Sequence, residues 1–178
     1  MMQDVYWEVH NMSYTIRENK IIPNLFIGNQ FHCFYHFRED IAVIHANQDP
    51  CHQRAVGYRN SLPTTHMHYW YMETRHHLYL NMVDSDRLLF YAPTLFVQAL
   101  RFIEKHIAER KVLVHSNNNF SRAPSIALLY LAKQTDIIDD SSYDAAAVDF
   151  GRLYPVYQPK RGIVNYLRRE WDHIVLPE

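Results

Sequence analysis

The segment VLVHSNNNFSRAPSIALLYLA, from Val112 to Ala132, places a short apolar run, a polar loop and a second apolar run in direct succession. The run Val112–Val114 follows a basic turn, and its short length favours a buried central strand. Ser121 is a favoured N-cap residue, so we predict a helix from there to about Gln134. The segment therefore predicts a strand, a loop over Asn117–Ser121 and a helix.

Apolar patterns elsewhere predict further elements. Strands are expected after a turn within Ile21–Gly28, over Ile41–Ala46, and over Leu78–Val83, which ends at Asp84. Asp49–Thr65 contains prolines and a glycine and predicts a long irregular connection. Helices are expected over Ala92–Glu109, opened by Pro93, over Ser141–Phe150 and over Gly162–Ile174. This succession predicts one α/β domain, with a mainly parallel central sheet flanked by helices.

Length and composition limit the possible classes of protein. The chain has 178 residues, 48% of them hydrophobic, and a net charge of -1. We predict a domain over residues 21–178, with residues 1–20 as an N-terminal extension packed on it. No basic field indicates a nucleic-acid partner, and no apolar run reaches the roughly 18 residues of a membrane span. The start MMQDVYWEVH lacks the pattern of a signal peptide, and two cysteines fit reduced thiols in a cytoplasmic protein.

The loop between the predicted strand and helix has the chemistry of an anion site. In a parallel sheet, ligands bind beyond the carboxyl ends of the strands. The loop lies at such an end, and the amides and dipole of a helix N-terminus favour an anion there. Arg122 adds a planar set of donors that suits two phosphate oxygens. The alternative is a polar loop with a surface arginine.

The same residues resemble the signature loop of the cysteine-dependent protein tyrosine phosphatases, and the dual-specificity branch most closely. That signature is His-Cys-x-x-Gly-x-x-Arg followed by Ser or Thr, and it is similar to His115-Ser116, five residues and Arg122. Pro23–Gly28 resembles the entry strand of that branch, and Tyr154–Val164 resembles its closing helical segment. The resemblance implies the family's fold from about Ile21 to Trp171. It implies phosphate contacts from the whole loop, Ser116, Asn117, Asn118, Asn119, Phe120, Ser121 and Arg122.

The resemblance also assigns positions of catalytic importance. Ser116 occupies the position of the nucleophile, Arg122 that of the phosphate-binding arginine and Asp84 that of the general acid. Asp86 is a rival for the acid, and Asp84 itself has the alternative of capping a turn. We expect His115 to support the loop from behind, since consecutive strand residues point to opposite faces.

Three departures from the signature bear on activity. Ser116 replaces the nucleophilic cysteine, and a serine hydroxyl does not ionise at neutral pH without an adjacent base. Asn119 replaces the loop glycine but tolerates a positive φ better than most residues. Ala123 replaces the hydroxyl residue that, in the family, stabilises the leaving thiolate. Together these losses favour a natural pseudophosphatase that binds a phosphorylated protein or another phosphate-bearing ligand.

Two other interpretations stay open at this point. One is an active tyrosine or dual-specificity phosphatase in which Ser116 stands in place of a natural cysteine. The other is a structural domain with a vestigial pocket.

Histidines and cysteines elsewhere give weaker signals. On a strand, two histidines spaced like His66 and His68 share a face and can bind zinc, but cysteine or carboxylate ligands at metal spacing are missing near them and near His76-His77. Cys51-His52 lies in an irregular segment without a matching acid. We therefore predict no metal site and no cofactor.

Overall fold

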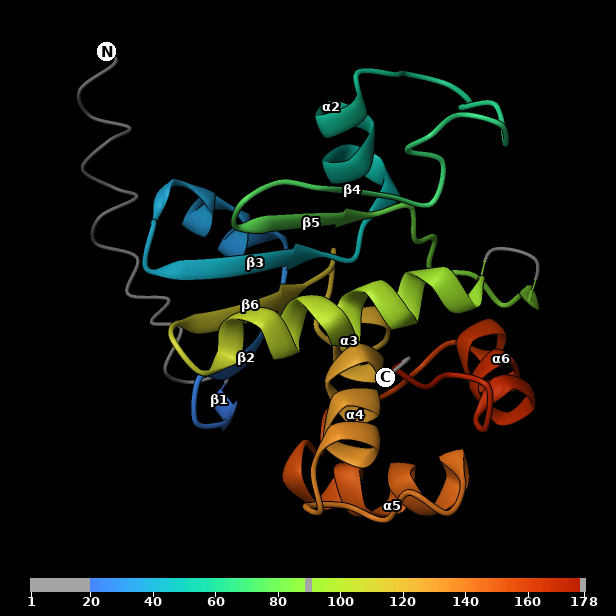
Figure 1. Cartoon of the computed structure of the whole chain (residues 1–178). Helices are drawn as coiled ribbons and strands as arrows, with labels where there is room; N and C mark the ends of the chain where they lie inside the picture. The colour runs from blue at the N-terminus through green and yellow to red at the C-terminus, as the bar shows by residue number, and fades with distance from the viewer. Residues whose placement is uncertain (1–19, 89–90, 177–178) are drawn as a thin grey trace.

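A six-stranded sheet forms the centre of the computed structural model, which describes residues 20–88 and 91–176 (Figure 1). The strand order is β1-β2-β6-β3-β5-β4. The strands are β1 (Lys20–Ile22), β2 (Leu25–Gly28), β3 (Ile41–His45), β4 (Tyr71–Glu73), β5 (His77–Leu80) and β6 (Lys111–His115). The four inner strands run parallel, and β1 and β4 pair antiparallel at the two edges. The predicted mainly parallel sheet is confirmed.

Helices connect and cover these strands. Short irregular helical segments follow β2 and β3, and longer α-helices follow β5 and β6. They are η2 (Gln30–Phe37), η3 (Gln48–His52), α2 (Gln53–Val56), α3 (Pro93–Ile107), α4 (Arg122–Gln134), α5 (Tyr143–Leu153) and α6 (Arg161–Glu170). The described residues therefore form a single α/β domain, as the sequence predicts.

The two faces of the sheet bury different sets of side chains, because successive strand residues point to opposite faces. Ala42 and Ile44 of β3 and Val112 and Val114 of β6 belong to the main core. This face packs against α3 and α4 (Figure 1). The other face carries a smaller cluster of Phe26, Ile41, Val43 and Leu113. The segment η2 contacts β3 and β6, the strands that supply three of these four residues.

Most predicted elements are confirmed, and the differences have local causes. The strand expected over Leu78–Val83 ends at Leu80, because the chain leaves the sheet to form the carboxyl-edge loop. The connection Asp49–Thr65 begins with the helical segments η3 and α2, since its first proline lies inside η3 rather than breaking it. The edge strands β1 and β4 were not predicted as separate strands; each is only three residues long. The predicted N-terminal extension lies almost wholly outside the described residues.

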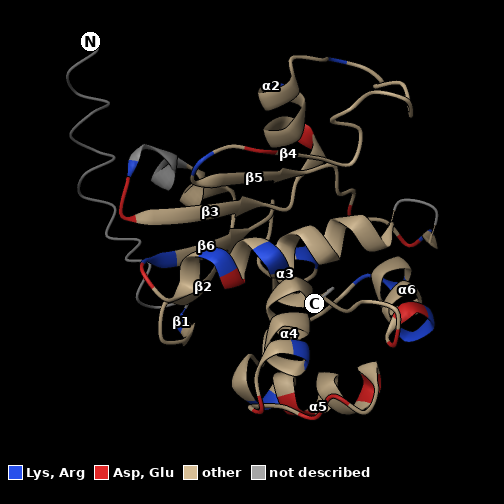
Figure 2. Cartoon of the chain, viewed as in Figure 1, with Lys and Arg blue, Asp and Glu red and all other residues tan. Residues whose placement is uncertain are grey.

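Charges of both signs are mixed along α3, α5 and α6 (Figure 2). Among the described residues, no helix combines the length and apolar character needed to cross a bilayer.

A candidate phosphate-binding loop

The loop Ser116–Ser121 follows β6 at the carboxyl edge of the sheet, where the four parallel strands all end (Figure 1). The predicted strand and helix on either side of it are confirmed as β6 and α4. The amide of Ser116 donates to the carbonyl oxygen of Gly28 at 3.3 Å, which fixes the start of the loop to the end of β2. The residues that follow the other parallel strands, Asn47 after β3 and Met82 after β5, complete this edge.

Arg122 is the first residue of α4, and its side chain is buried at this edge, only 3% exposed. Its Nη1 donates to Oδ1 of Asn47 at 2.6 Å and to the carbonyl oxygen of Met82 at 2.9 Å. Its Nε is buried and has no acceptor within the described part of the chain. Burial lowers the pKa of Arg122, but a guanidinium remains protonated at neutral pH. The edge therefore holds a buried positive charge with an unsatisfied donor.

The backbone of the loop is anchored from outside through its carbonyl groups. The carbonyl oxygen of Asn119 accepts from the Tyr154 hydroxyl at 3.0 Å, and that of Phe120 accepts from the Gln158 amide at 2.8 Å. Across residues 20–88 and 91–176, the amides of Asn117, Asn118 and Asn119 donate no hydrogen bond to the protein. These amides are donors that an anion can use.

The carbonyl group of Asn118 differs from those of Asn119 and Phe120, because its hydrogen-bond partner lies within the loop. The Ser116 hydroxyl donates a short hydrogen bond to the carbonyl oxygen of Asn118. Asn119 does not use its tolerance of positive φ, since Asn24 is the one described non-glycine residue with φ in that region. A hydrogen bond from the Ser116 hydroxyl therefore closes the loop, and no residue of the loop adopts a left-handed conformation.

Ser121 precedes α4 but does not cap it through its side chain, contrary to the sequence-based expectation. Its hydroxyl instead donates to Oδ1 of Asp84 at 2.8 Å and accepts from the amide of Lys160 at 3.2 Å. The rival carboxylate Asp86 accepts from the amide of Arg161 at 3.2 Å, at the first turn of α6. The structure thus places Asp84 beside the loop and gives Asp86 a contact at the start of a helix.

Asn47 is a site residue that sequence reasoning missed. It is 1% exposed, and its side chain accepts from Arg122 while donating to Oδ1 of Asn117. A buried amide that satisfies two partners at once holds both in fixed positions. The available signal was a polar residue shortly after a buried parallel strand, since Asn47 comes two residues after the end of β3.

His115 points away from the loop, toward the sheet face of the smaller core cluster. Its Nε2 lies 2.7 Å from Nδ1 of His45, the residue beside it on β3. Its Nδ1 is buried without a hydrogen-bond partner among the described residues. The ring therefore meets the neighbouring strand, and its effect on the loop passes through the backbone.

Comparisons with solved structures identify the fold. The human tyrosine phosphatase-like serine/threonine/tyrosine-interacting protein is 20% identical, with a TM-score of 0.58, covering 87% of this chain and 95% of its own. Human DUSP28 is 17% identical, with a TM-score of 0.57, covering 87% of this chain and 94% of its own. Tk-PTP in its active form is 16% identical, with a TM-score of 0.59, covering 88% and 97%.

At these identities the likeness establishes the fold, which is that of the dual-specificity and tyrosine phosphatase-like domains. No family model and no curated protein matches the chain.

Proposed function

We propose that this domain binds a phosphate group in the loop Ser116–Arg122 and does not hydrolyse it. The ligand is a phosphorylated protein or another phosphate-bearing molecule. The observation that carries the proposal is the buried guanidinium of Arg122, whose Nε has no acceptor within the described residues. A phosphate oxygen supplies the missing acceptor, and the amides of Asn117–Asn119 supply further donors.

The loss of turnover follows from the surroundings of Ser116. Its hydroxyl donates to the carbonyl oxygen of Asn118, a neutral group that does not act as a general base. The adjacent imidazole of His115 faces His45 instead. A serine without a base stays protonated, so it does not attack phosphorus.

A second candidate function is phosphatase activity in a natural form with cysteine at position 116. The observation that favours it is Asp84, at the family's general-acid position, held beside the loop by the Ser121 hydroxyl at 2.8 Å. A carboxyl group beside the loop supports a role in protonating a leaving oxygen.

Titration calorimetry with inorganic phosphate tests the binding proposal. We expect saturable binding, and we expect Arg122→Lys to weaken it about tenfold or more. A point charge cannot replace the planar fork, and a hydrogen bond to a charged group contributes about 1.5–3 kcal/mol. Arg59→Lys, at an exposed position, is the matched control and should bind like the unmutated chain. Equal affinity for the Arg122→Lys and unmutated proteins would count against the proposal.

Turnover of an aryl phosphate separates the two candidate functions. We expect none from the chain itself and little from Ser116→Cys, because Asn119 and Ala123 remain. Adding Asn119→Gly and Ala123→Ser should raise the rate, and Asp84→Asn should lower that gain, since these groups act as a unit. If Ser116→Cys alone reached the rate of the triple variant, the result would favour the second candidate function, an active phosphatase in which Ser116 stands in place of a natural cysteine.

A further inference from the structure

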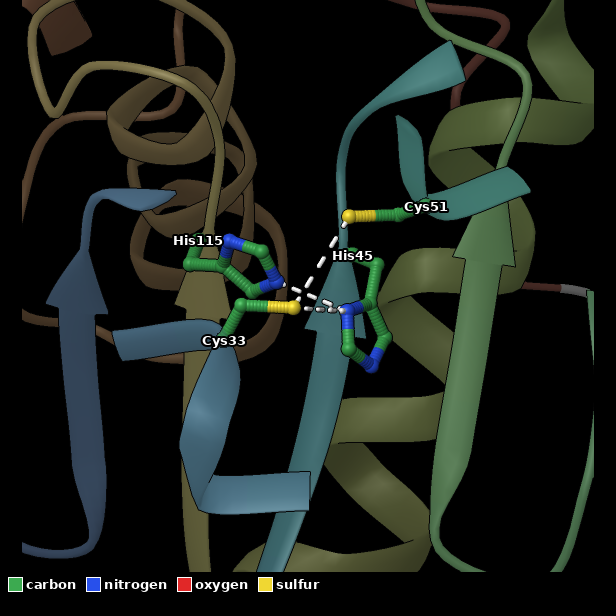
Figure 3. Close-up of side chains that lie close together, drawn as sticks. All are labelled: Cys33, His45, Cys51 and His115. Carbon is green, nitrogen blue, oxygen red and sulfur yellow. Dashed lines mark hydrogen bonds between the residues drawn. The ribbon is translucent and has the colours of Figure 1, made fainter. Parts of the chain in front are cut away.

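Two cysteines and two histidines meet beside β3 and β6, on the sheet face opposite α3 and α4 (Figure 3). They are Cys33, His45, Cys51 and His115, and one ligand atom from each lies within 4.8 Å of all the others. Both imidazoles are almost completely buried, at 1% and 0% exposed, and Cys51 is 7% exposed. The proposed phosphate-binding function uses none of these side chains directly.

The fold brings these four residues together from distant parts of the sequence. His45 and His115 are register partners on adjacent parallel strands, so their side chains stand next to each other on one face. Cys33 comes from η2, the segment that packs against these two strands. Cys51 comes from η3, which continues from the carboxyl end of β3. Each ligand is thus positioned by a strand or helical segment of the domain.

The ligand atoms all lie within 4.8 Å of one another, and two of the distances between them match the edges of a tetrahedral zinc shell. The Sγ atoms of Cys33 and Cys51 are 3.9 Å apart, and Sγ of Cys33 is 3.7 Å from Nδ1 of His45. Zn–S and Zn–N bonds of about 2.3 and 2.05 Å in a tetrahedron require edges of about 3.8 Å between two sulfurs and about 3.6 Å between sulfur and nitrogen. The two imidazole nitrogens are 2.7 Å apart. A tetrahedral ion requires about 3.3 Å between them, so the rings would separate by about 0.6 Å on binding.

The charges of this ligand set also suit a divalent metal ion. Two thiolates and two neutral imidazoles around a divalent cation give zero net charge, which limits the cost of burial.

The surroundings support the ligands and leave a path to them. Nε2 of His45 lies 3.3 Å from Nδ1 of His77, and a second hydrogen bond of this kind orients a metal-binding imidazole. The ring of Tyr79 stacks on His45 with centroids 4.4 Å apart. A cavity of about 320 Å³ is lined by Cys33, His45 and Cys51, together with Arg54 and Tyr79. It provides a route for an ion from the surface.

We propose that Cys33, His45, Cys51 and His115 form a four-coordinate, structural Zn²⁺ site. Four protein ligands leave no open position, so the site stabilises the fold rather than activating water. Asn47 connects it to the candidate phosphate-binding loop, because its Nδ2 lies 4.0 Å from Sγ of Cys51 while its Oδ1 accepts from Arg122. The proposal stands independently of the proposed phosphate binding.

Metal content and cobalt substitution test the site. The full chain is purified under reducing conditions, stripped with a chelator and titrated with Zn²⁺ or Co²⁺. We expect one metal ion per chain. The cobalt form should show the intense visible bands of tetrahedral Co²⁺ together with a thiolate-to-cobalt charge-transfer band. Cys33→Ser and Cys51→Ser should each reduce that band, and the double variant should abolish it. His173→Gln, at an exposed histidine, is the control and should leave the spectrum unchanged.

A measurement on the unmutated chain covers the case in which the variants fail to fold. Bound Zn²⁺ should slow the reaction of both thiols with an aromatic disulfide reagent, and a chelator should restore the rate. Three results would overturn the proposal: no stoichiometric metal in the reduced chain, thiol reactivity unaffected by Zn²⁺, or folded cysteine variants with an unchanged cobalt spectrum. Loss of two hydrogens by mass, with formation of a Cys33–Cys51 disulfide in the presence of Zn²⁺, would overturn it in favour of a redox pair.

Discussion

Gly162 shows how a single residue allows the segment after Asp84 to pack against α6. It lies in the first turn of α6, and an added Cβ would meet the carbonyl oxygen of Ser85 at 2.2 Å and that of Arg87 at 2.8 Å. Contacts this short with backbone atoms do not occur, so the segment after Asp84 lies against α6 only because position 162 has no side chain.

We predict that Gly162→Ala lowers the free energy of unfolding by about 2–3 kcal/mol, because the overpacked backbone segments must separate. Urea denaturation measures the change. Gly151→Ala is the matched control, since nothing lies within 4 Å of a Cβ there. It lies inside α5, so the control should be neutral or stabilising by up to about 1 kcal/mol. Similar losses for both variants would contradict this explanation.

At the residue scale, the sequence indicated where the candidate loop begins and ends but not which side chains pair within it. The pattern around His115 and Arg122 was visible in one short segment. The contact of Arg122 with Asn47 joins residues 75 positions apart. No local pattern contains such a pair, because the partner is chosen by the order of strands in the sheet.

Among the elements, α5 has the clearest local origin. Ser142 precedes its first turn, and the serine side chain accepts a hydrogen bond from the amide of Ala145 at 3.1 Å. The negative charge of Asp144 in the first turn also stabilises the helix, because it lies near the positive end of the helix dipole. The sequence contained all of these signals within a few residues, and the helix is present where it was predicted.

We predict that Ser142→Ala destabilises the domain by about 1 kcal/mol, through the loss of this cap. Thermal unfolding followed by circular dichroism measures the shift. Ser61→Ala, at an exposed serine outside any helix or strand, should leave the midpoint unchanged. An unchanged midpoint for Ser142→Ala would show that the end of α5 is held by packing alone.

The strands show the limit of such local reasoning. The apolar run of β3 predicted a buried strand, and it is one. Its last residue, His45, was not predicted to belong to a site, because its contact with His115 depends on β6 lying beside β3 in register. Pairing partners and register in a parallel sheet are decided by long connections, which local patterns do not encode.

For the molecule as a whole, buried histidines link stability to pH. His106 in the last turn of α3 is 6% exposed and packs against Phe102, with ring centroids 4.5 Å apart. Burial lowers the pKa of His106 below the ordinary histidine value of 6.5, and the positive charges of Lys105 and Arg110 act in the same direction. The unfolded chain therefore binds more protons than the folded chain as the pH falls below that value.

We predict that the free energy of unfolding falls as the pH drops through 6.5, the ordinary pKa of a histidine in an unfolded chain, and that the contribution of His106 is fully present above it. His106→Leu removes one of the titrating groups, so its stability should depend less steeply on pH across that window. Urea denaturation at several pH values compares the two proteins. His173→Gln is the control, because this exposed histidine should leave the slope as it is in the unmutated chain. Identical slopes for His106→Leu and the unmutated chain would exclude a contribution from His106.

By itself the sequence determined the fold class, the strand-loop-helix that contains Ser116 and Arg122, and the positions of the main helices. These features depend on apolar periodicity and capping within short windows, which act before any long-range contact forms. The tertiary structure alone decided that Asn47 pairs with Arg122 and that Ser121 donates to Asp84 instead of capping its own helix. It also decided that two cysteines and two histidines form one cluster. Each of these groupings joins segments that are remote in the chain. They become neighbours only when parallel strands end at a common edge and one face of the sheet is covered.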